Sequence, residues 1–200
     1  GQDGIVTVAF ETRRDQLSAF LDLLRTILRA PSFPAAEFEQ LRSQWLTALD
    51  AERSQPESLA GRALARHDNP YPKGDVRYAE SLEEQLAAIK GLRLLELQTF
   101  HRAFYGAAHA QLALVGDFDA PAVATQVKRL FGDWHARQAV ARISTPFREH
   151  AGEQIRLASP DKANAFFFAR LRLPLRDDSP DAAALAIANR VLGGGSLKSR

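Results

Sequence analysis

Apolar residues in the first half of the chain recur mostly three or four positions apart, which is the spacing of amphipathic helices. Leu17, Leu21, Leu24 and Leu28 illustrate the pattern, because they fall on one face of a helix that starts near residue 17. The same spacing predicts five further helices. One begins after Pro34, one after Pro56, two cover about 81–90 and 93–105, and the last extends from residue 120 to near Trp134.

Shorter stretches carry the signals of β-strands instead. Residues 5–10 and 112–115 are compact apolar runs, and residues 154–157 and 165–173 contain alternating apolar and polar positions. A last helix is predicted from Ser179-Pro180 to Leu192, and the three glycines 193–195 would end it. The chain therefore alternates between predicted strands and predicted helices.

A polar, arginine-rich stretch separates two parts of the chain. Residues 135–150 contain only scattered apolar positions and are interpreted as an interdomain linker. This assignment gives a first α/β domain over 1–134 and the beginning of a second one over 151–200.

Composition excludes several classes of function. The chain has 200 residues, of which 46% are hydrophobic and 25% are charged, as expected for a globular protein with a real core. Its 26 Lys and Arg nearly balance 24 Asp and Glu, so nothing indicates a nucleic-acid partner. No cysteine is present, which excludes thiolate metal sites and disulfides. No apolar run is long enough to predict a membrane span.

Six short motifs occur in an order that resembles one known family, with Leu-Phe-Gly-Asp-Trp at 130–134 between the fourth and fifth. The motifs are Phe33–Glu39, Tyr71–Tyr78, Phe100–Gly106, Leu114–Asp119, Asp161–Ala165 and Val191–Gly195. Together they are similar to the pitrilysin or insulinase type (M16) of zinc peptidase. The resemblance covers almost the whole chain and points to the second, noncatalytic half of a long bacterial member.

The resemblance implies an α+β fold, in which helices pack on one face of a mostly antiparallel sheet, followed by the start of a second similar domain. It also implies a clamshell of two halves that encloses an unfolded peptide, which a zinc-bound water hydrolyses. In the catalytic half, His-x-x-Glu-His on a helix places two zinc ligands on the same face, and the Glu acts as general base.

This chain does not contain that zinc site. Its five histidines stand at 67, 101, 109, 135 and 150, and no two of them are four residues apart. The resemblance places Ala48 where the family has its downstream zinc-binding Glu, and a methyl group cannot bind a metal. We therefore assign no catalytic residue, no metal ligand and no cofactor to this segment, and we expect zinc in the catalytic half of the parent enzyme.

Other polar residues have structural interpretations that compete with functional ones. His101 lies on an apolar helix and is expected to be a packed, hydrogen-bonded histidine. Asp119 is expected to cap the next helix, while Asp117 has no assigned role. His67 with Asp68 could hold a cation but lacks the further ligands of a zinc site. The glycines at 193–195 follow a helix, whereas phosphate loops precede one.

Substrate contacts are the remaining question. Phe166 and Phe168 are candidates for a peptide-binding surface, although consecutive strand residues face opposite sides and at least one ring of 166–168 is expected in the core.

Two functions stay open. The chain is either chamber wall and peptide-binding surface beside a catalytic M16 half, or part of a catalytically dead binding or assembly subunit. The presence of His-x-x-Glu-His in the other half would distinguish them. Resemblance to bacterial secreted members favours the periplasm, and the cytoplasm stays open.

Overall fold

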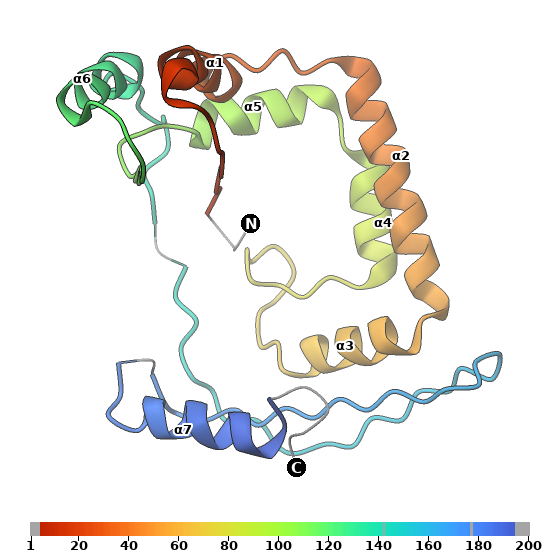
Figure 1. The fold of residues 1–200 in the computed structure, drawn as a ribbon. Helices are drawn as coiled ribbons and strands as arrows, with labels where there is room; N and C mark the ends of the chain where they lie inside the picture. Colours follow the sequence, from red (N-terminus) through yellow and green to blue (C-terminus); the bar gives the residue numbers. More distant parts are fainter. Residues whose placement is uncertain (1–4, 142, 177, 195–200) are drawn as a thin grey trace. The chain divides into compact units, whose positions relative to one another are not determined.

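The protein is described here by a computed structural model, which covers residues 5–141, 143–176 and 178–194 (Figure 1). Its regular structure in these ranges is helical. The α-helices are α1 (Leu17–Arg29), α2 (Ala35–Ala51), α3 (Pro56–His67), α4 (Leu82–Gly91), α5 (Leu94–Phe104), α6 (Ala120–Phe131) and α7 (Ala182–Asn189). Short 3-10 turns cover Arg14–Gln16 and Glu52–Ser54, and a π-helical turn covers Arg190–Gly194.

The prediction of an α+β fold with a mostly antiparallel sheet was wrong. Within the described ranges no residue belongs to a β-strand, and the stretches 5–10, 112–115, 154–157 and 165–173 have neither helix nor strand. Alternating or compact apolar residues indicate a chain that suits a pleated surface, but a strand forms only when a second segment pairs with its backbone. Ile5, Val6 and Leu112 are accordingly exposed rather than covered.

Most predicted helices and their caps are confirmed. Ser81 and Glu84 form a capping box at the start of the helix predicted over about 81–90, since the Glu84 backbone N–H donates to Ser81 Oγ and Ser81 N–H donates to the Glu84 carboxylate. Asp119 Oδ1 accepts from the N–H of Ala122 at 3.0 Å and so caps α6. The last helix starts later than predicted, at Ala182, and gives way to the π-helical turn after Asn189. Gly195 lies outside the described residues.

The chain divides into two compact units. Unit 1 comprises Gly1–Ala48 with Leu86–Arg142, and unit 2 comprises Leu49–Gln85 with Ile143–Arg200. Each unit is therefore assembled from two separate stretches of sequence. The predicted division into 1–134, a linker over 135–150, and 151–200 stays a prediction.

Unit 1 has an apolar core where α1 meets α6. Leu17, Leu21 and Leu130 are buried, and Leu21 has no exposed surface at all. Partly buried side chains surround them: Phe10, Leu114, Phe118, Val123, Val127 and Phe131. Polar contacts join the two helices at their edges, since Arg29 binds both the Asp133 carboxylate and the carbonyl oxygen of Leu130. Burial of the leucine faces is the main source of stability here.

A close backbone crossing ties the end of α5 to the chain that follows α6. Ala107 N–H donates to Trp134 O at 2.7 Å, and Gln138 N–H donates to Ala103 O at 2.9 Å. Gly106 lies between these two hydrogen bonds, and a Cβ atom on it would overlap the backbone of Ala136. The crossing therefore requires glycine at this position.

Unit 2 is built around α3 and the loop that follows it. Pro56 stands in the first turn of α3, and the helix ends at His67 with Asp68 as its C-cap. Polar contacts join the loop 68–81 to the stretch 143–176, as Arg77 with Ser144 and Arg170 with Asp68 show. Among the described residues no helix combines the length and apolar character needed to cross a bilayer.

Candidate functional site

Phe166 and Phe168 lie together on one side of their segment. Their ring centroids are 4.8 Å apart, and they are 42% and 44% exposed, whereas Phe167 between them is 86% exposed. A Cβ atom on Gly61 would come 3.8 Å from the Phe168 ring, so this ring lies beside α3. None of the three rings is buried, contrary to the expectation that at least one of them fills the core.

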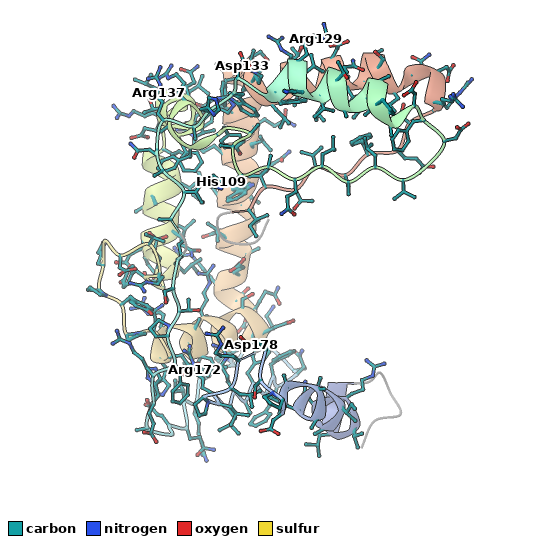
Figure 2. All side chains as sticks on the ribbon, turned by 90° about the vertical axis from the view of Figure 1, so that its left-hand side faces the viewer. His109, Arg129, Asp133, Arg137, Arg172 and Asp178 are labelled. Atoms are coloured by element: carbon teal, nitrogen blue, oxygen red, sulfur yellow. The ribbon has the colours of Figure 1, made fainter. Side chains whose placement is uncertain are left out.

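Two residues further along the same segment, a pair of arginines converges on the end of α3. Asp68 is only 7% exposed, and its Oδ2 atom accepts from Arg170 Nη1 at 3.0 Å and from Arg172 Nε at 3.3 Å. The two arginine side chains are nearly half exposed, and Arg172 is labelled in Figure 2. The even-numbered residues 166–172 therefore present two aromatic rings and two cations along α3.

The charges of this cluster explain the ionisation of Asp68. Burial alone would raise the pKa of its carboxyl. The hydrogen bond from Arg170 and the positive charge of Arg172 lower the pKa by more than burial raises it, so the pKa lies below its usual value. The carbonyl end of a helix favours cations and disfavours anions, so at the end of α3 it is the two arginines that stabilise the Asp68 carboxylate. Asp68 is therefore ionised at neutral pH and carries one negative charge against two positive ones.

His67 does not join Asp68 in a cation site. Its Nδ1 lies 2.9 Å from the Glu153 carboxylate, and its Nε2 lies 3.4 Å from the carbonyl oxygen of Ala151. Asp68 points instead to the two arginines. In the part of the chain that the structure describes, no three His, Cys, Asp or Glu side chains come together as a possible metal site.

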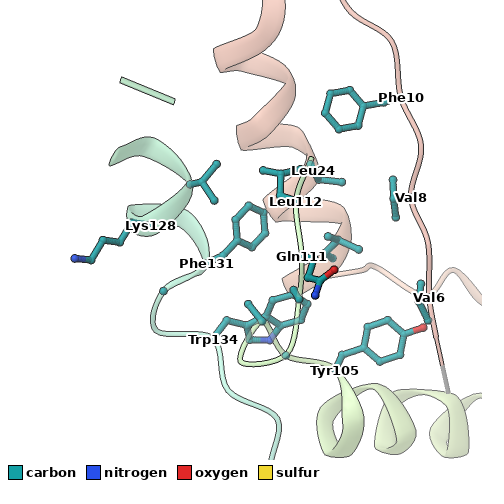
Figure 3. Close-up of a pocket in the computed structure, with 16 residues that line it drawn as sticks. Val6, Val8, Phe10, Leu24, Tyr105, Gln111, Leu112, Lys128, Phe131 and Trp134 are labelled. Carbon is teal, nitrogen blue, oxygen red and sulfur yellow. The ribbon is translucent and has the colours of Figure 1, made fainter. Parts of the chain in front are cut away.

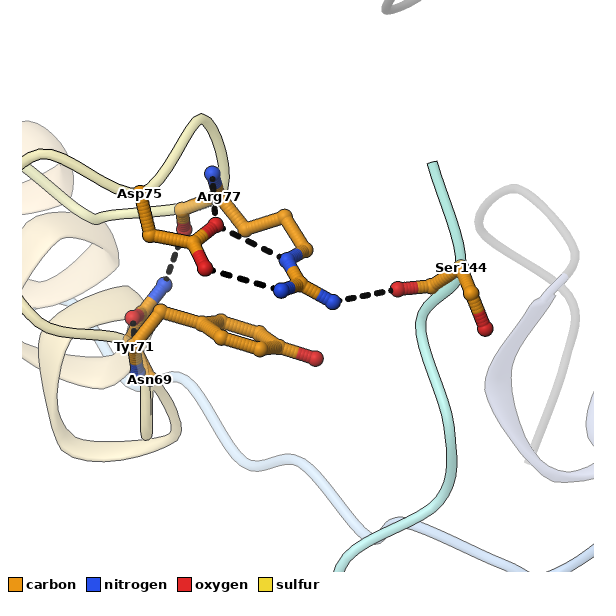
Figure 4. A network of polar contacts seen from close by, with 5 residues as sticks. All are labelled: Asn69, Tyr71, Asp75, Arg77 and Ser144. Carbon is orange, nitrogen blue, oxygen red and sulfur yellow. Dashed lines mark hydrogen bonds and ion pairs between the residues drawn. The ribbon is translucent and has the colours of Figure 1, made fainter. Parts of the chain in front are cut away.

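The loop after α3 is held by a network around Tyr71 (Figure 4). The Arg77 guanidinium lies 3.8 Å from the centre of the Tyr71 ring, forms two hydrogen bonds to Asp75, and donates to the carbonyl oxygen of Ser144. Because Arg77 donates to it from both side chain and backbone, the pKa of Asp75 falls to about 2. The network fixes the loop 69–77 against the stretch near 144.

Glu84 is the second polar anchor of this loop. Its carboxylate accepts from Lys73 Nζ at 2.8 Å, from the Tyr78 hydroxyl at 3.0 Å and from the N–H of Ser81. These donors lower the pKa of Glu84 to about 2, the Lys73 hydrogen bond contributing most. Glu84 therefore links the start of α4 to the loop.

Unit 1 contains an apolar pocket of about 390 Å³ (Figure 3). Aliphatic and aromatic side chains dominate its lining, while Tyr105, Gln111 and Trp134 bring polar atoms to it. Lys128 borders the pocket, and Figure 3 shows its ammonium group extending away from it. The remaining lining residues are Val6, Val8, Phe10, Leu24, Leu28, Gly106, Ala107, Ala110, Leu112, Val127, Phe131 and Gly132. The apolar pattern of residues 5–10, interpreted as a strand, was the sequence signal for this wall.

The other polar residues singled out in the sequence have structural partners. His101 is half-buried, and its Nε2 lies 2.7 Å from the carbonyl oxygen of Leu28, as expected for a packed histidine. Asp117, which had no assigned role, binds Arg14 at 2.7 Å through both carboxylate oxygens. Asp117 and Asp119 thus serve local structure.

The model of the family described as the Peptidase M16 inactive domain matches residues 92–200. This match covers more than half of the chain, so the chain belongs to the Peptidase M16 inactive domain family. Searches of curated proteins and of solved structures return no match. The resemblance found from the motifs is therefore confirmed at the level of the family.

The zinc that the wider peptidase family uses does not fit the residues of this chain. The sequence offers no pair of histidines one helical turn apart, and Asp68, the best buried carboxylate, is bound to two arginines. A carboxylate held by two guanidinium groups is a poor metal ligand, because its negative charge is already balanced and a metal ion would be repelled by the two nearby cations.

Proposed function

We propose that this domain is the noncatalytic partner of a zinc metalloendopeptidase half, and that it contributes chamber wall and a peptide-binding surface to proteolysis carried out there. Membership of the inactive-domain family is the observation that carries the proposal. Zinc would belong to the catalytic half, and the periplasm is the proposed compartment.

The exposed aromatic pair supports the peptide-binding part of the proposal. Phe166 and Phe168 form a small apolar surface whose rings are in contact with each other and leave almost half of their area open. Aromatic side chains give large contact area at low cost in conformational entropy, and they dominate binding energy at many interfaces. We expect apolar side chains of an extended peptide to pack on these two rings.

A binding experiment tests this surface. A fluorescently labelled, unfolded peptide rich in apolar residues is titrated with the full chain, and its anisotropy is followed. Phe166→Ala and Phe168→Ala should each weaken binding about tenfold. Phe167→Ala is the matched control, since its ring is 86% exposed and is not part of the contact between Phe166 and Phe168. A larger loss from Phe167→Ala than from the other two would refute the assignment.

A second experiment tests the partnership. The chain is combined with the half of the parent that carries His-x-x-Glu-His, and peptide cleavage is followed with and without a chelator. Chelator-sensitive cleavage that increases when this chain is added supports the proposal. Failure of the two halves to associate, or cleavage that this chain does not affect, would favour a binding or assembly subunit instead.

A further inference from the structure

We propose that Arg170 and Arg172 form a binding site for a peptide carboxylate next to the aromatic pair. The site would take the carboxylate of a residue whose apolar side chain lies on Phe166 and Phe168. This inference rests on the proposed peptide-binding function and adds to it the chemical class of the ligand.

The first support is the charge balance at Asp68. Two guanidinium groups share one oxygen of a single buried carboxylate, so the cluster has one positive charge in excess. In the described part of the chain Asp68 is the only ion-pair partner of either arginine. A second carboxylate would balance the cluster, and it would gain hydrogen bonds to charged donors.

The second support is the number of free donors. A guanidinium has five N–H donors, and Asp68 accepts from only Nη1 of Arg170 and Nε of Arg172. Both side chains are nearly half exposed, so the remaining N–H groups are open to a ligand. Asp68 holds the two groups in place, which reduces the entropy that a ligand would otherwise have to overcome.

The third support is the spacing along the segment. Phe168 and Arg170 are two residues apart and on the same side, which corresponds to about 7 Å in an extended chain. Within one amino acid or between neighbouring ones, an apolar side chain and a carboxylate can span a similar distance. The aromatic rings and the guanidinium groups can therefore contact one ligand together.

The test compares matched peptides on the full chain. One labelled peptide ends in phenylalanine with a free carboxylate, a second is the same peptide with an amidated end, and a third is amidated but carries a Glu beside the phenylalanine. We expect amidation to weaken binding about tenfold. Recovery with the third peptide would show that a side-chain carboxylate serves as well, and no recovery would identify the chain end as the ligand.

Variants separate binding from folding. Arg172→Gln should weaken binding of the free-acid peptide about tenfold, while Arg170 still pairs with Asp68. The acid and amide peptides should then bind with the same affinity. Asp68→Asn keeps an acceptor oxygen that can hold the arginines in place but removes the competing negative charge, so it should strengthen free-acid binding, which a purely structural arginine pair would not do. Arg137→Gln, an exposed arginine of unit 1, is the control and should change nothing. Circular dichroism verifies that each variant is folded.

The outcomes distinguish the two proposals. Equal binding of acid and amide peptides, with losses from Phe166→Ala and Phe168→Ala, would overturn the carboxylate site and leave the peptide-binding function standing. Inorganic phosphate that competes while amidation has no effect would also overturn it, since the site would then hold a phosphate rather than a peptide carboxylate. No binding of any peptide would overturn both.

Discussion

The two units of this chain are stabilised by different interactions. In unit 1 leucines of α1 and α6 bury each other, with Leu21 completely covered. In unit 2 the buried residue at the end of α3 is a carboxylate, Asp68, and the loop after it is held by Arg77, Asp75 and Glu84. An apolar core depends little on salt and pH, whereas charged contacts depend on both.

This difference bears on where binding is expected. In unit 1 the core leucines pack on one another, and the pocket beside them has a mainly apolar lining. Unit 2 leaves guanidinium groups and aromatic rings partly open beside a fixed helix, so it presents both charge and apolar area. We therefore place the peptide contacts of the proposed function in unit 2.

The largest expected effect is the loss of the unit 1 core. Leu21→Ala creates a cavity at a side chain with no exposed surface and should lower the free energy of unfolding of unit 1 by about 3 kcal/mol. Leu23→Ala, at an exposed position on the same helix, should change it by less than about 0.5 kcal/mol. Amide hydrogen exchange of α1 and α6 measures both. Similar losses from the two variants would contradict the proposed core.

The next effect concerns the carboxylate of unit 2. Asp68→Ala removes the acceptor of two charged hydrogen bonds, and we expect the opening free energy of the C-terminal end of α3 to fall by about 1–2 kcal/mol. Asp178→Ala removes an exposed partner of Arg176 and serves as control. Hydrogen exchange at 64–68 reports the change. If exchange at α1 increased equally, the two units would not be independently stabilised.

A helix cap in unit 1 gives a smaller effect. Asp119→Ala leaves the N–H of Ala122 without its acceptor and should cost about 1 kcal/mol of α6 stability. Asp119→Asn keeps an acceptor oxygen and should recover most of that loss. Thermal unfolding of the three proteins provides the measurement, and an unchanged midpoint in the alanine variant would show that the cap contributes nothing.

The smallest effect is the pH dependence of the exposed network. The pKa of Glu84 is lowered to about 2 in the folded chain, below its value in an unfolded chain. The contribution of the Glu84 carboxylate to folded-state stability is therefore complete above about pH 5, and it is lost as the pH falls towards about 2. Hydrogen exchange of the loop 73–84 should rise over that range, while α1 should change less. Glu84→Gln should flatten the pH response, and an unchanged response would exclude Glu84 as its cause.

Local signals in the sequence were sufficient for the helices. Helical spacing, Pro56 in a first turn, the Ser81–Glu84 box and the Asp119 cap each depend on residues within one or two turns, so the chain carries that information locally. The family was also predicted correctly, and the matched residues 92–200 include four of the six motifs.

The sheet and the arginine cluster required information that local patterns do not contain. Alternation at 165–173 showed which residues share a side but not which segment, if any, pairs with the backbone. Asp68 and Arg170 are 102 residues apart, so nothing near either residue indicates their contact. The alternation of Phe166, Phe168, Arg170 and Arg172 does predict side chains on one side of the segment. It does not predict that the two arginines bind Asp68 at the end of α3.

The crossing at Gly106 restricts where the chain can accept extra residues. Two hydrogen bonds pin the backbone from Trp134 to Gln138 against the end of α5, and residue 106 tolerates no side chain between them. An inserted tag or loop at 135–137 would separate both pinned ends. The exposed Val140 is a better position for an insertion, because it lies beyond Gln138, where the hydrogen-bonded stretch ends.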